Sequence, residues 1–345
     1  MAKIEFLFDG EASVDQAQAI EQGDLPRLLD KDGAFVWIDV DGNDPEDIER
    51  IQKLFGLHRL AVESATTVAE RAKITLYDDM IYVEFYGLHL DGDEVIPEEI
   101  ALFVGEKFLV SIRRGNTPTL EHIRQRWADD QARVIEPQDH SGFAFPWAHH
   151  RNSRKVPSTA MLLYAILDDL VDHYFPIVEW LGDQIEDLEA LVVAEKSREP
   201  QVEIQHMRSR LLRLRRMLGP EQEVLNTLLR RDVPIIPEEV IPYFADVHDH
   251  VLRIHDWMES YRDQLSTIVD LNLSMQSNKL NRTMRTLTAS SIILMVCSLV
   301  AGIYGMNFVH MPELNWLVGY PLALGLMVVL GLGLYKTFRR QGWWE

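Results

Sequence analysis

Residues 304–308 read Tyr-Gly-Met-Asn-Phe, and two long apolar runs flank them near the C-terminus. The first run, residues 286–304 (TLTASSIILMVCSLVAGIY), has no charged residue, and the second, residues 317–338 (LVGYPLALGLMVVLGLGLYKTF), has only Lys336. About 20 apolar residues in a helix, at ~1.5 Å per residue, span a bilayer core of roughly 30 Å. We therefore predict two membrane-spanning helices rather than a buried hairpin of a soluble domain, which would not need charge-free runs of this length.

The charges beside these runs predict the orientation of the chain in the membrane. The loop at residues 305–316 has no Lys or Arg and carries Glu313, whereas both outer flanks are basic. Basic flanks remain in the cytoplasm, so we expect a multi-pass protein of the cell membrane, in contact with the lipid bilayer, with both termini cytoplasmic. The flanking cations are Lys279, Arg282, Arg285, Lys336, Arg339 and Arg340.

Composition fits a large acidic body attached to these spans. The 345 residues include 54 acidic and 34 basic side chains, a formal charge of −20. Such a balance disfavours nucleic acid and favours cations as partners. The single cysteine, Cys297, lies inside the first apolar run, which excludes a disulfide framework or a cysteine metal site. No signal-peptide pattern opens the chain, so the first span is expected to target it.

The rest of the chain divides into segments of different character. Short apolar or alternating runs at residues 35–40, 80–86, 100–104 and 108–112 predict strands. Asp44 followed by Pro45 predicts the start of a helix. The predicted organisation is a cytosolic α/β domain with a linker (1–157), a cytosolic helical hairpin (158–236), a stalk helix continuing into the first span (237–304), an extracytoplasmic loop (305–316), the second span (317–338) and a cytosolic tail (339–345).

Two long helical segments precede the stalk. Residues 158–194 are rich in acid and predict one helix, and residues 200–231 are rich in arginine. We expect them to form an antiparallel hairpin with ion pairs between its helices; cation binding by the acidic helix is the alternative. For the linker histidines, a polar surface loop is favoured over a metal sensor. These residues are His140, His149 and His150.

The stalk helix carries the most informative pattern. No proline occurs between Pro242 and Pro312, so residues 243–304 can form one helix of some 60 residues. Its apolar positions from Val247 to Ile268 recur every three or four residues, which predicts packing against other helices around an oligomer axis. Near the membrane the stripe becomes small and polar, so it faces other helices or water, and several copies together could enclose a pore. This second stripe is Asn281, Met284, Thr288, Ser291, Met295, Ser298 and Gly302.

The Tyr-Gly-Met-Asn sequence follows the first span, and Met-Pro-Glu-Leu (311–314) and Gly-Tyr-Pro (319–321) come after it. Together these motifs resemble the CorA family of divalent-cation channels. The resemblance covers most of the chain, strongly from about Tyr164 onward. It also includes residues 164–175, 231–234, 243–250 and 277–281.

The resemblance implies a homopentamer, funnel-shaped, with the stalk helix lining a pore and the last helix facing lipid. It places the selectivity filter on Gly305, Met306 and Asn307. The stripe itself favours Thr288 as a pore residue, whereas the family favours its neighbour Leu287. The pore and gate positions that the family implies are Asn281, Met284, Leu287, Met295 and Ser298.

The resemblance also implies gating by cytosolic Mg²⁺. Asp246 matches a family sensing position, and its partner should come from the N-terminal domain of a neighbouring copy. The candidate partners are Asp91, Asp93, Glu98 and Glu99, and Asp168 or Asp172 can contribute a second site; ordinary solvated acids are the alternative. Nearby histidines could favour Co²⁺, Ni²⁺ or Zn²⁺, although packing or surface roles are favoured for them. These are His248, His250 and His255.

The resulting functional hypothesis is entry of hydrated Mg²⁺, with Co²⁺ and Ni²⁺ as further candidates, down its electrochemical gradient. The chain lacks a GxxxxGK[ST] phosphate-binding loop, so neither ATP coupling nor enzymatic activity is expected. Two alternatives remain: a zinc transporter of the same superfamily, which the intact Gly-Met-Asn disfavours, and a membrane-anchored sensor that conducts nothing, which the polar stripe disfavours.

Overall fold

The computed structural model describes residues 3–8, 13–14, 34–67, 71–114, 117–123, 158–194, 200–233, 235–306, 311–312, 316 and 318–344. Its contacts divide the chain into two compact units, Met1–Ala190 with Gln201–Leu265 and Leu191–Pro200 with Ser266–Glu345. The strands are β1 (Lys3–Phe8), β2 (Ser13–Val14), β3 (Phe35–Asp41), β4 (Lys73–Leu76), β5 (Met80–Asp91), β6 (Glu94–Gly105) and β7 (Phe108–Arg113). The helices are α2 (Pro45–Phe55), α3 (Arg59–Thr66), α5 (Thr159–Asp172), α6 (Tyr174–Val193), α7 (Pro200–Leu228), α8 (Ile241–Tyr304) and α9 (Gly319–Arg340).

The first unit is built on one seven-stranded mixed sheet with the order β2-β1-β3-β7-β6-β5-β4. β3 and β7 pair in parallel, with Ile38 opposite Val110, and every other described pair is antiparallel. The four strands predicted from apolar patterning are β3, β5, β6 and β7, which form the buried centre of the sheet. Their continuous apolar runs are explained by helices on both faces of the sheet.

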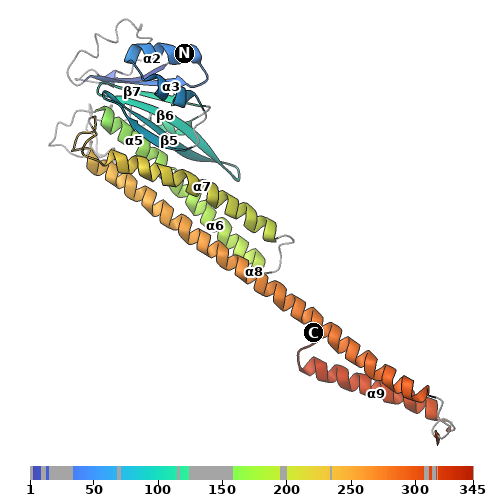
Figure 1. Cartoon of the computed structure of the whole chain (residues 1–345). Coiled ribbons are helices and arrows are strands. Elements are labelled where there is room, and N and C mark those ends of the chain that lie inside the picture. Colours follow the sequence, from blue (N-terminus) through green and yellow to red (C-terminus); the bar gives the residue numbers. More distant parts are fainter. Residues whose placement is uncertain are drawn as a thin grey trace. The chain divides into compact units, whose positions relative to one another are not determined.

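Helices α2 and α3 cover one face of the sheet (Figure 1). Asp44 caps α2 as predicted, because its side chain accepts hydrogen bonds from the N–H groups of Glu46 and Asp47. Ile48 and Ile51 of α2 pack into the same core cluster as the inward side chains of β3 and β6.

Helix α5 packs against β5, β6 and β7 on the opposite face. The Thr159 hydroxyl at its first turn donates to the carbonyl of Gly105 at 2.7 Å, which anchors the helix to the sheet. The prediction of one helix over residues 158–194 is wrong, because α5 ends at Asp172 and α6 begins at Tyr174. Pro176 accounts for the break, since it has no N–H to donate to the carbonyl four residues earlier.

Helices α6, α7 and α8 lie side by side in the first unit (Figure 1). Gly182 allows α6 to approach α8 closely, since a Cβ there would lie 2.5 Å from the Tyr261 hydroxyl oxygen. The expected ion pairs between the two hairpin helices are not found among the described residues of α6 and α7. Arg215 of α7 pairs instead with Glu259 of α8 at 3.3 Å, and Arg210 lies over the Trp180 ring at 5.3 Å.

Helix α8 is a single helix of 64 residues, as the absence of proline predicted. At ~1.5 Å per residue it is about 96 Å long. Its predicted apolar stripe is buried within this one chain: Val247, Val251 and Ile254 are fully buried and Met258 is 4% exposed. Packing around an oligomer axis is therefore the wrong explanation for this part of the stripe, because helices of the same chain cover it.

Candidate ion pathway and metal clusters

In the second unit, α8 presents one face to α9 and leaves the opposite face uncovered. Ala289 and Val300 are buried, and the Cys297 thiol lies 3.9 Å from the Met327 carbonyl oxygen of α9. A Cβ at Gly331 of α9 would lie 3.8 Å from Ile293. These positions recur at three- and four-residue spacing, so they define one side of the helix.

The predicted pore positions lie on the other side of α8. At ~100° per residue, the mean direction of the small and polar stripe is roughly opposite the contact face of α9. Leu287 and Thr288 lie about 55° and 45° from the direction opposite the α9 contact face, one on each side, so this geometry does not choose between them. All five predicted pore residues are exposed in the single chain; they are Asn281, Met284, Leu287, Met295 and Ser298.

Both C-terminal helices are long, apolar and largely uncovered. Among the 18 most apolar consecutive residues of each helix, 11% are buried in α8 and 6% in α9. A core helix of a soluble protein would instead be mostly buried, so this exposure favours contact with lipid or with other copies.

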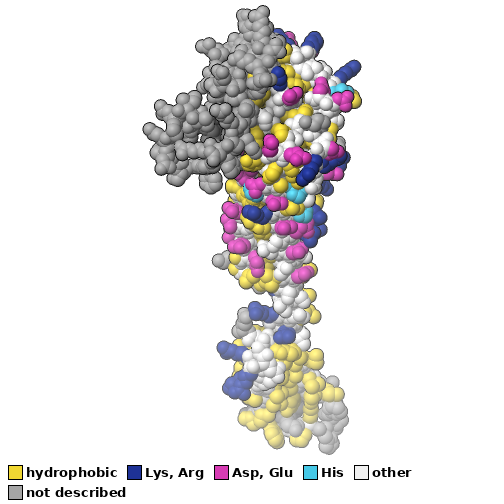
Figure 2. Space-filling view, turned by 90° about the vertical axis from the view of Figure 1, so that its left-hand side faces the viewer, with side chains coloured by type: hydrophobic (Ala, Val, Ile, Leu, Met, Phe, Trp, Pro, Cys, Tyr) yellow, Lys and Arg dark blue, Asp and Glu magenta, His cyan; other side chains and the backbone are white. Residues whose placement is uncertain are grey.

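The basic flanks of the two helices lie at the same end of this unit. The Thr286 hydroxyl near the start of the first span lies 3.3 Å from the Trp343 carbonyl oxygen beyond α9. Trp343 also stacks on Phe338, with ring centroids 5.3 Å apart. Figure 2 shows Lys and Arg side chains gathered beside the hydrophobic surface of these helices. The two basic flanks therefore lie at the same end of this pair of helices, which is the arrangement that the positive-inside pattern predicts.

The predicted filter is only partly described. Helix α8 ends at Tyr304, and the N–H groups of Gly305 and Met306 donate to the Ala301 and Ile303 carbonyls at 2.9 and 3.2 Å. Asn307 and Glu313 lie outside the described residues, as do the linker histidines His140, His149 and His150.

Two of the predicted regulatory acids meet a histidine in the first unit. Asp168 and Asp172 of α5 and His250 of α8 place ligand atoms within 4.8 Å of one another. His250 Nδ1 lies 3.5 Å from the Asp172 carboxylate, and this contact raises the pKa of His250 against the opposing effect of burial. The charges of Asp246, one turn earlier on α8, and of Asp168 raise the same pKa. The structure therefore brings two of the seven predicted acids, Asp168 and Asp172, to one histidine, and a third, Asp246, acts on its pKa through charge alone.

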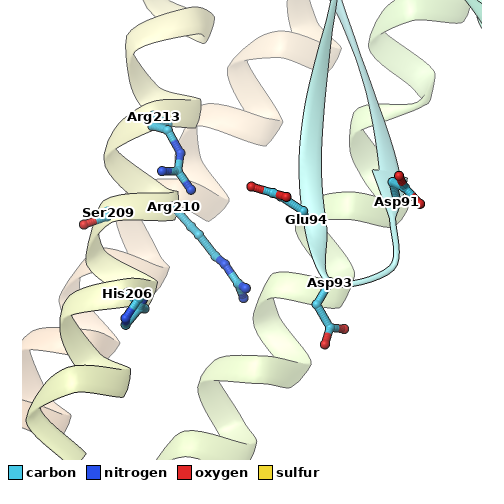
Figure 3. Close-up of a pocket in the computed structure, with 7 residues that line it drawn as sticks. All are labelled: Asp91, Asp93, Glu94, His206, Ser209, Arg210 and Arg213. Carbon is cyan, nitrogen blue, oxygen red and sulfur yellow. The ribbon is translucent and has the colours of Figure 1, made fainter. Parts of the chain in front are cut away.

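Asp91 and Asp93 lie at the β5–β6 turn, on opposite sides of Gly92. Figure 3 shows Arg210 and Arg213 of α7 extending toward this turn. These guanidinium groups of the same chain partly offset the negative potential that a cation would require. The turn and α7 line an open pocket of about 520 Å³, formed by Asp91, Asp93, Glu94, His206, Ser209, Arg210 and Arg213.

Glu98 and Glu99 lie on β6, and each contacts a basic side chain of the same chain. Glu98 is 3% exposed, and its carboxylate lies 2.9 Å from His89 Nδ1. Glu99 lies 3.7 Å from Arg114. Among the described residues, neither glutamate nor the two turn aspartates joins Asp246 in a three-ligand group. A partner for Asp246 from another copy of the chain therefore stays a prediction.

Glu221 is a buried carboxyl group that the sequence analysis did not predict. Glu221 of α7 is fully buried, and its carboxylate oxygen lies 2.7 Å from the Tyr174 hydroxyl, which is also 2.7 Å from the Tyr86 carbonyl. Burial raises the pKa of Glu221 to about 8 and raises the pKa of Tyr174 as well. Helical spacing could have predicted its burial, because Glu221 lies three residues after Leu218 and four before Leu225 on the buried face of α7.

A family model and individual known proteins match this chain, and they agree on the family. Residues 32–340 match the family model of the CorA-like Mg²⁺ transporter protein. A cobalt/magnesium transport protein CorA of Thermotoga maritima is 30% identical over 89% of this chain and 83% of that protein. The putative metal ion transporter YfjQ of Bacillus subtilis is 32% identical over 95% of this chain and 96% of its own length.

Solved structures share the fold. The complete CorA magnesium transporter of Methanocaldococcus jannaschii matches with a TM-score of 0.73 at 24% identity, over 90% of this chain and 92% of that one. The cytoplasmic domain of ZntB from Vibrio parahaemolyticus matches with a TM-score of 0.55 at 15% identity, over 72% and 96%. At these identities the likeness concerns the fold alone.

Proposed function

Since this chain belongs to the family of CorA-like Mg²⁺ transporter proteins, we propose that it conducts hydrated Mg²⁺ into the cytoplasm through a pore lined by α8. Co²⁺ is a further candidate ion, because a relative is named for cobalt as well as magnesium. Ni²⁺ is another, because its ligand preferences are close to those of Co²⁺. The observation that carries the proposal is the uncovered small and polar face of α8, opposite α9. A lipid-facing helix has no use for such a face, and five copies can enclose water between them.

The chemistry of the pore residues suits a hydrated cation. Mg²⁺ holds its octahedral water shell strongly and loses it reluctantly. A ring of neutral Asn307 amides accepts hydrogen bonds from those waters without binding the ion as tightly as carboxylates would. Met295 and Leu287 form apolar rings that can close the pore by excluding water. A divalent ion gains roughly 4.6 kcal/mol per 100 mV on entering a negative interior, so no coupled energy source is required.

Regulation by cytosolic Mg²⁺ is the second part of the proposal. Asp168 and Asp172 supply the carboxylate oxygens that Mg²⁺ accepts beside its waters, and His250 and Asp246 complete the cluster electrostatically. Carboxylates crowded in this way repel one another unless a cation lies between them. Loss of the ion would therefore loosen the packing of α5 against α8, the helix that also lines the proposed pore.

Zinc transport is the second candidate function. It is favoured by His250, which provides a nitrogen ligand that Zn²⁺ accepts better than Mg²⁺ does. The cobalt and magnesium relatives, which match at higher identity, favour Mg²⁺. The orientation with both termini cytoplasmic rests on the basic flanks and belongs to the proposal.

The test is ion flux into proteoliposomes that contain a Mg²⁺-sensitive dye and have a negative interior. Wild type should admit Mg²⁺ in proportion to the potential, and Asn307→Ala should lose this flux. The matched control is Asn226→Ala, which changes an exposed asparagine of α7 and should conduct as wild type does. Zn²⁺ entry without Mg²⁺ entry would support the zinc function instead, and no flux of either ion would support a non-conducting sensor.

A further inference from the structure

A second group of potential metal ligands lies on the other side of α5. His122 Nδ1 is 3.1 and 3.2 Å from the two carboxylate oxygens of Asp169. His173 Nδ1 is 3.7 Å from the same carboxylate. One ligand atom from each residue lies within 4.8 Å of the other two. No sequence pattern predicted this group, because His122 precedes Asp169 by 47 residues.

The backbone positions this group separately from the Asp168 cluster. Asp168 and Asp169 are neighbours on α5 and point in directions ~100° apart. Asp168 therefore faces His250 of α8, whereas Asp169 faces His122 at the end of the helical turn at residues 118–123. His173 follows Asp169 by four residues, where α5 gives way to α6, so both side chains lie on one side of the chain.

The burial of the three side chains fits a prepared ligand set. Only 4% of the Asp169 side chain is exposed, whereas 56% of His122 and 41% of His173 are exposed. The carboxylate is thus held rigidly, and both imidazoles remain accessible to an ion from solution. His173 Nδ1 lies 2.6 Å from the Asp169 carbonyl oxygen. Such a bond from a histidine to a backbone carbonyl orients the ring and leaves Nε2 with its lone pair.

The ligand types select a class of metal. Two imidazole nitrogens and one carboxylate oxygen suit Zn²⁺, Co²⁺ or Ni²⁺, whereas Mg²⁺ prefers oxygen ligands alone. With metal–ligand distances of about 2.0–2.2 Å, two ligands of one ion lie roughly 3–3.5 Å apart. The contact between His122 and Asp169 already has this separation. His173 can bind through Nε2, or through Nδ1 in exchange for its carbonyl bond, by rotation of an exposed ring.

We propose that His122, Asp169 and His173 form a binding site for a transition-metal ion of the Zn²⁺, Co²⁺ or Ni²⁺ class. The ion displaces the proton shared between His122 and Asp169, and water fills its remaining coordination positions. The site joins the turn at residues 118–123 to the α5–α6 junction. This site is separate from the proposed conduction pathway and from the oxygen-rich cluster of Asp168 and Asp172. The inference therefore goes beyond the proposed transport function.

The test measures Zn²⁺ binding to the full-length protein by calorimetry in excess Mg²⁺, with His250→Gln as the background that weakens the neighbouring cluster. This background should bind one Zn²⁺ per chain, and adding His122→Gln and His173→Gln should weaken that binding at least about tenfold. Asp169 is left unchanged because it is buried. His206→Gln in the same background changes an exposed histidine of α7 and should have no effect.

Spectroscopy and stability provide independent readouts. Co²⁺ bound to the His250→Gln protein should show the absorption of nitrogen-ligated Co²⁺, and the triple variant should lose it. The unfolding temperature without metal should stay equal in the two proteins, which shows that the variant is folded. Unchanged Zn²⁺ affinity in the triple variant, or no Zn²⁺ binding in the His250→Gln protein, overturns the proposal. Because no flux is measured, failure here is distinguishable from failure of the transport function.

Discussion

Replacement of Glu221 by Gln is expected to stabilise the protein, and increasingly so as the pH rises. The Tyr174 hydroxyl has one proton but lies 2.7 Å from two oxygen atoms, those of Glu221 and of the Tyr86 carbonyl. A protonated Glu221 satisfies both contacts, because it donates to Tyr174 while Tyr174 donates to Tyr86. An ionised Glu221 has no proton to donate. Its buried carboxylate then competes with the Tyr86 carbonyl for the single proton of the Tyr174 hydroxyl. The Gln amide donates as the protonated acid does, without ionising.

The raised pKa sets the size of the effect. Burial raises the pKa of Glu221 from its ordinary value of 4.5 to about 8. The folded state therefore binds this proton more tightly than the unfolded state. Its stabilising contribution is complete below about pH 4.5 and is lost as the pH rises toward 8. At about 1.4 kcal/mol per pH unit, the advantage of Glu221→Gln is under about 1 kcal/mol at pH 5, roughly 3 kcal/mol at pH 7 and about 5 kcal/mol above pH 8.

The assay is thermal unfolding of the full-length protein in detergent, followed by intrinsic fluorescence between pH 5 and 9. For a unit of this size, the pH 7 difference corresponds to a rise of roughly 6–12 °C in the unfolding temperature. Glu223→Gln, an exposed change on the same helix, is the matched control and should leave the pH profile unchanged. If Glu221→Gln unfolds at the same or a lower temperature than wild type at pH 8, the reasoning about the buried proton is refuted.

Three further predictions follow from the fold and the proposed pore. Asp44→Ala removes the hydrogen bonds that begin α2 and should lower the midpoint of denaturant unfolding. An unchanged midpoint would contradict the capping role. Phe244→Ala leaves a cavity at a fully buried position of α8 and should cost about 3–5 kcal/mol, so a loss below about 1 kcal/mol in the same assay would show that the site collapses or is not packed as described. In a Cys297→Ser background, Leu287→Cys should react with a water-soluble thiol reagent and lose Mg²⁺ flux in proteoliposomes, whereas Thr288→Cys should react more slowly; the reverse order would assign the pore lining to Thr288.

The sequence determined the parts of this protein whose physics is local or periodic. Three local signals predicted α8 and α9: apolar runs of membrane length with at most one charge, the basic residues beside them and the proline-free interval before residue 304. Apolar runs predicted the central strands, and Asp44 before Pro45 predicted α2. Each of these signals lies within one helix or strand. Burial or lipid contact stabilises that helix or strand whatever the rest of the chain does.

The tertiary structure decided which distant side chains meet. It placed His250 with Asp168 and Asp172, directed the neighbouring Asp169 to His122, and put Glu221 against Tyr174. It also showed that the apolar stripe of α8 is covered by helices of its own chain. Sequence spacing could not supply these results, because two residues on different helices meet only through the packing and rotation of those helices. A lone carboxylate or histidine looks the same in the sequence whether it faces solvent, another helix or an ion.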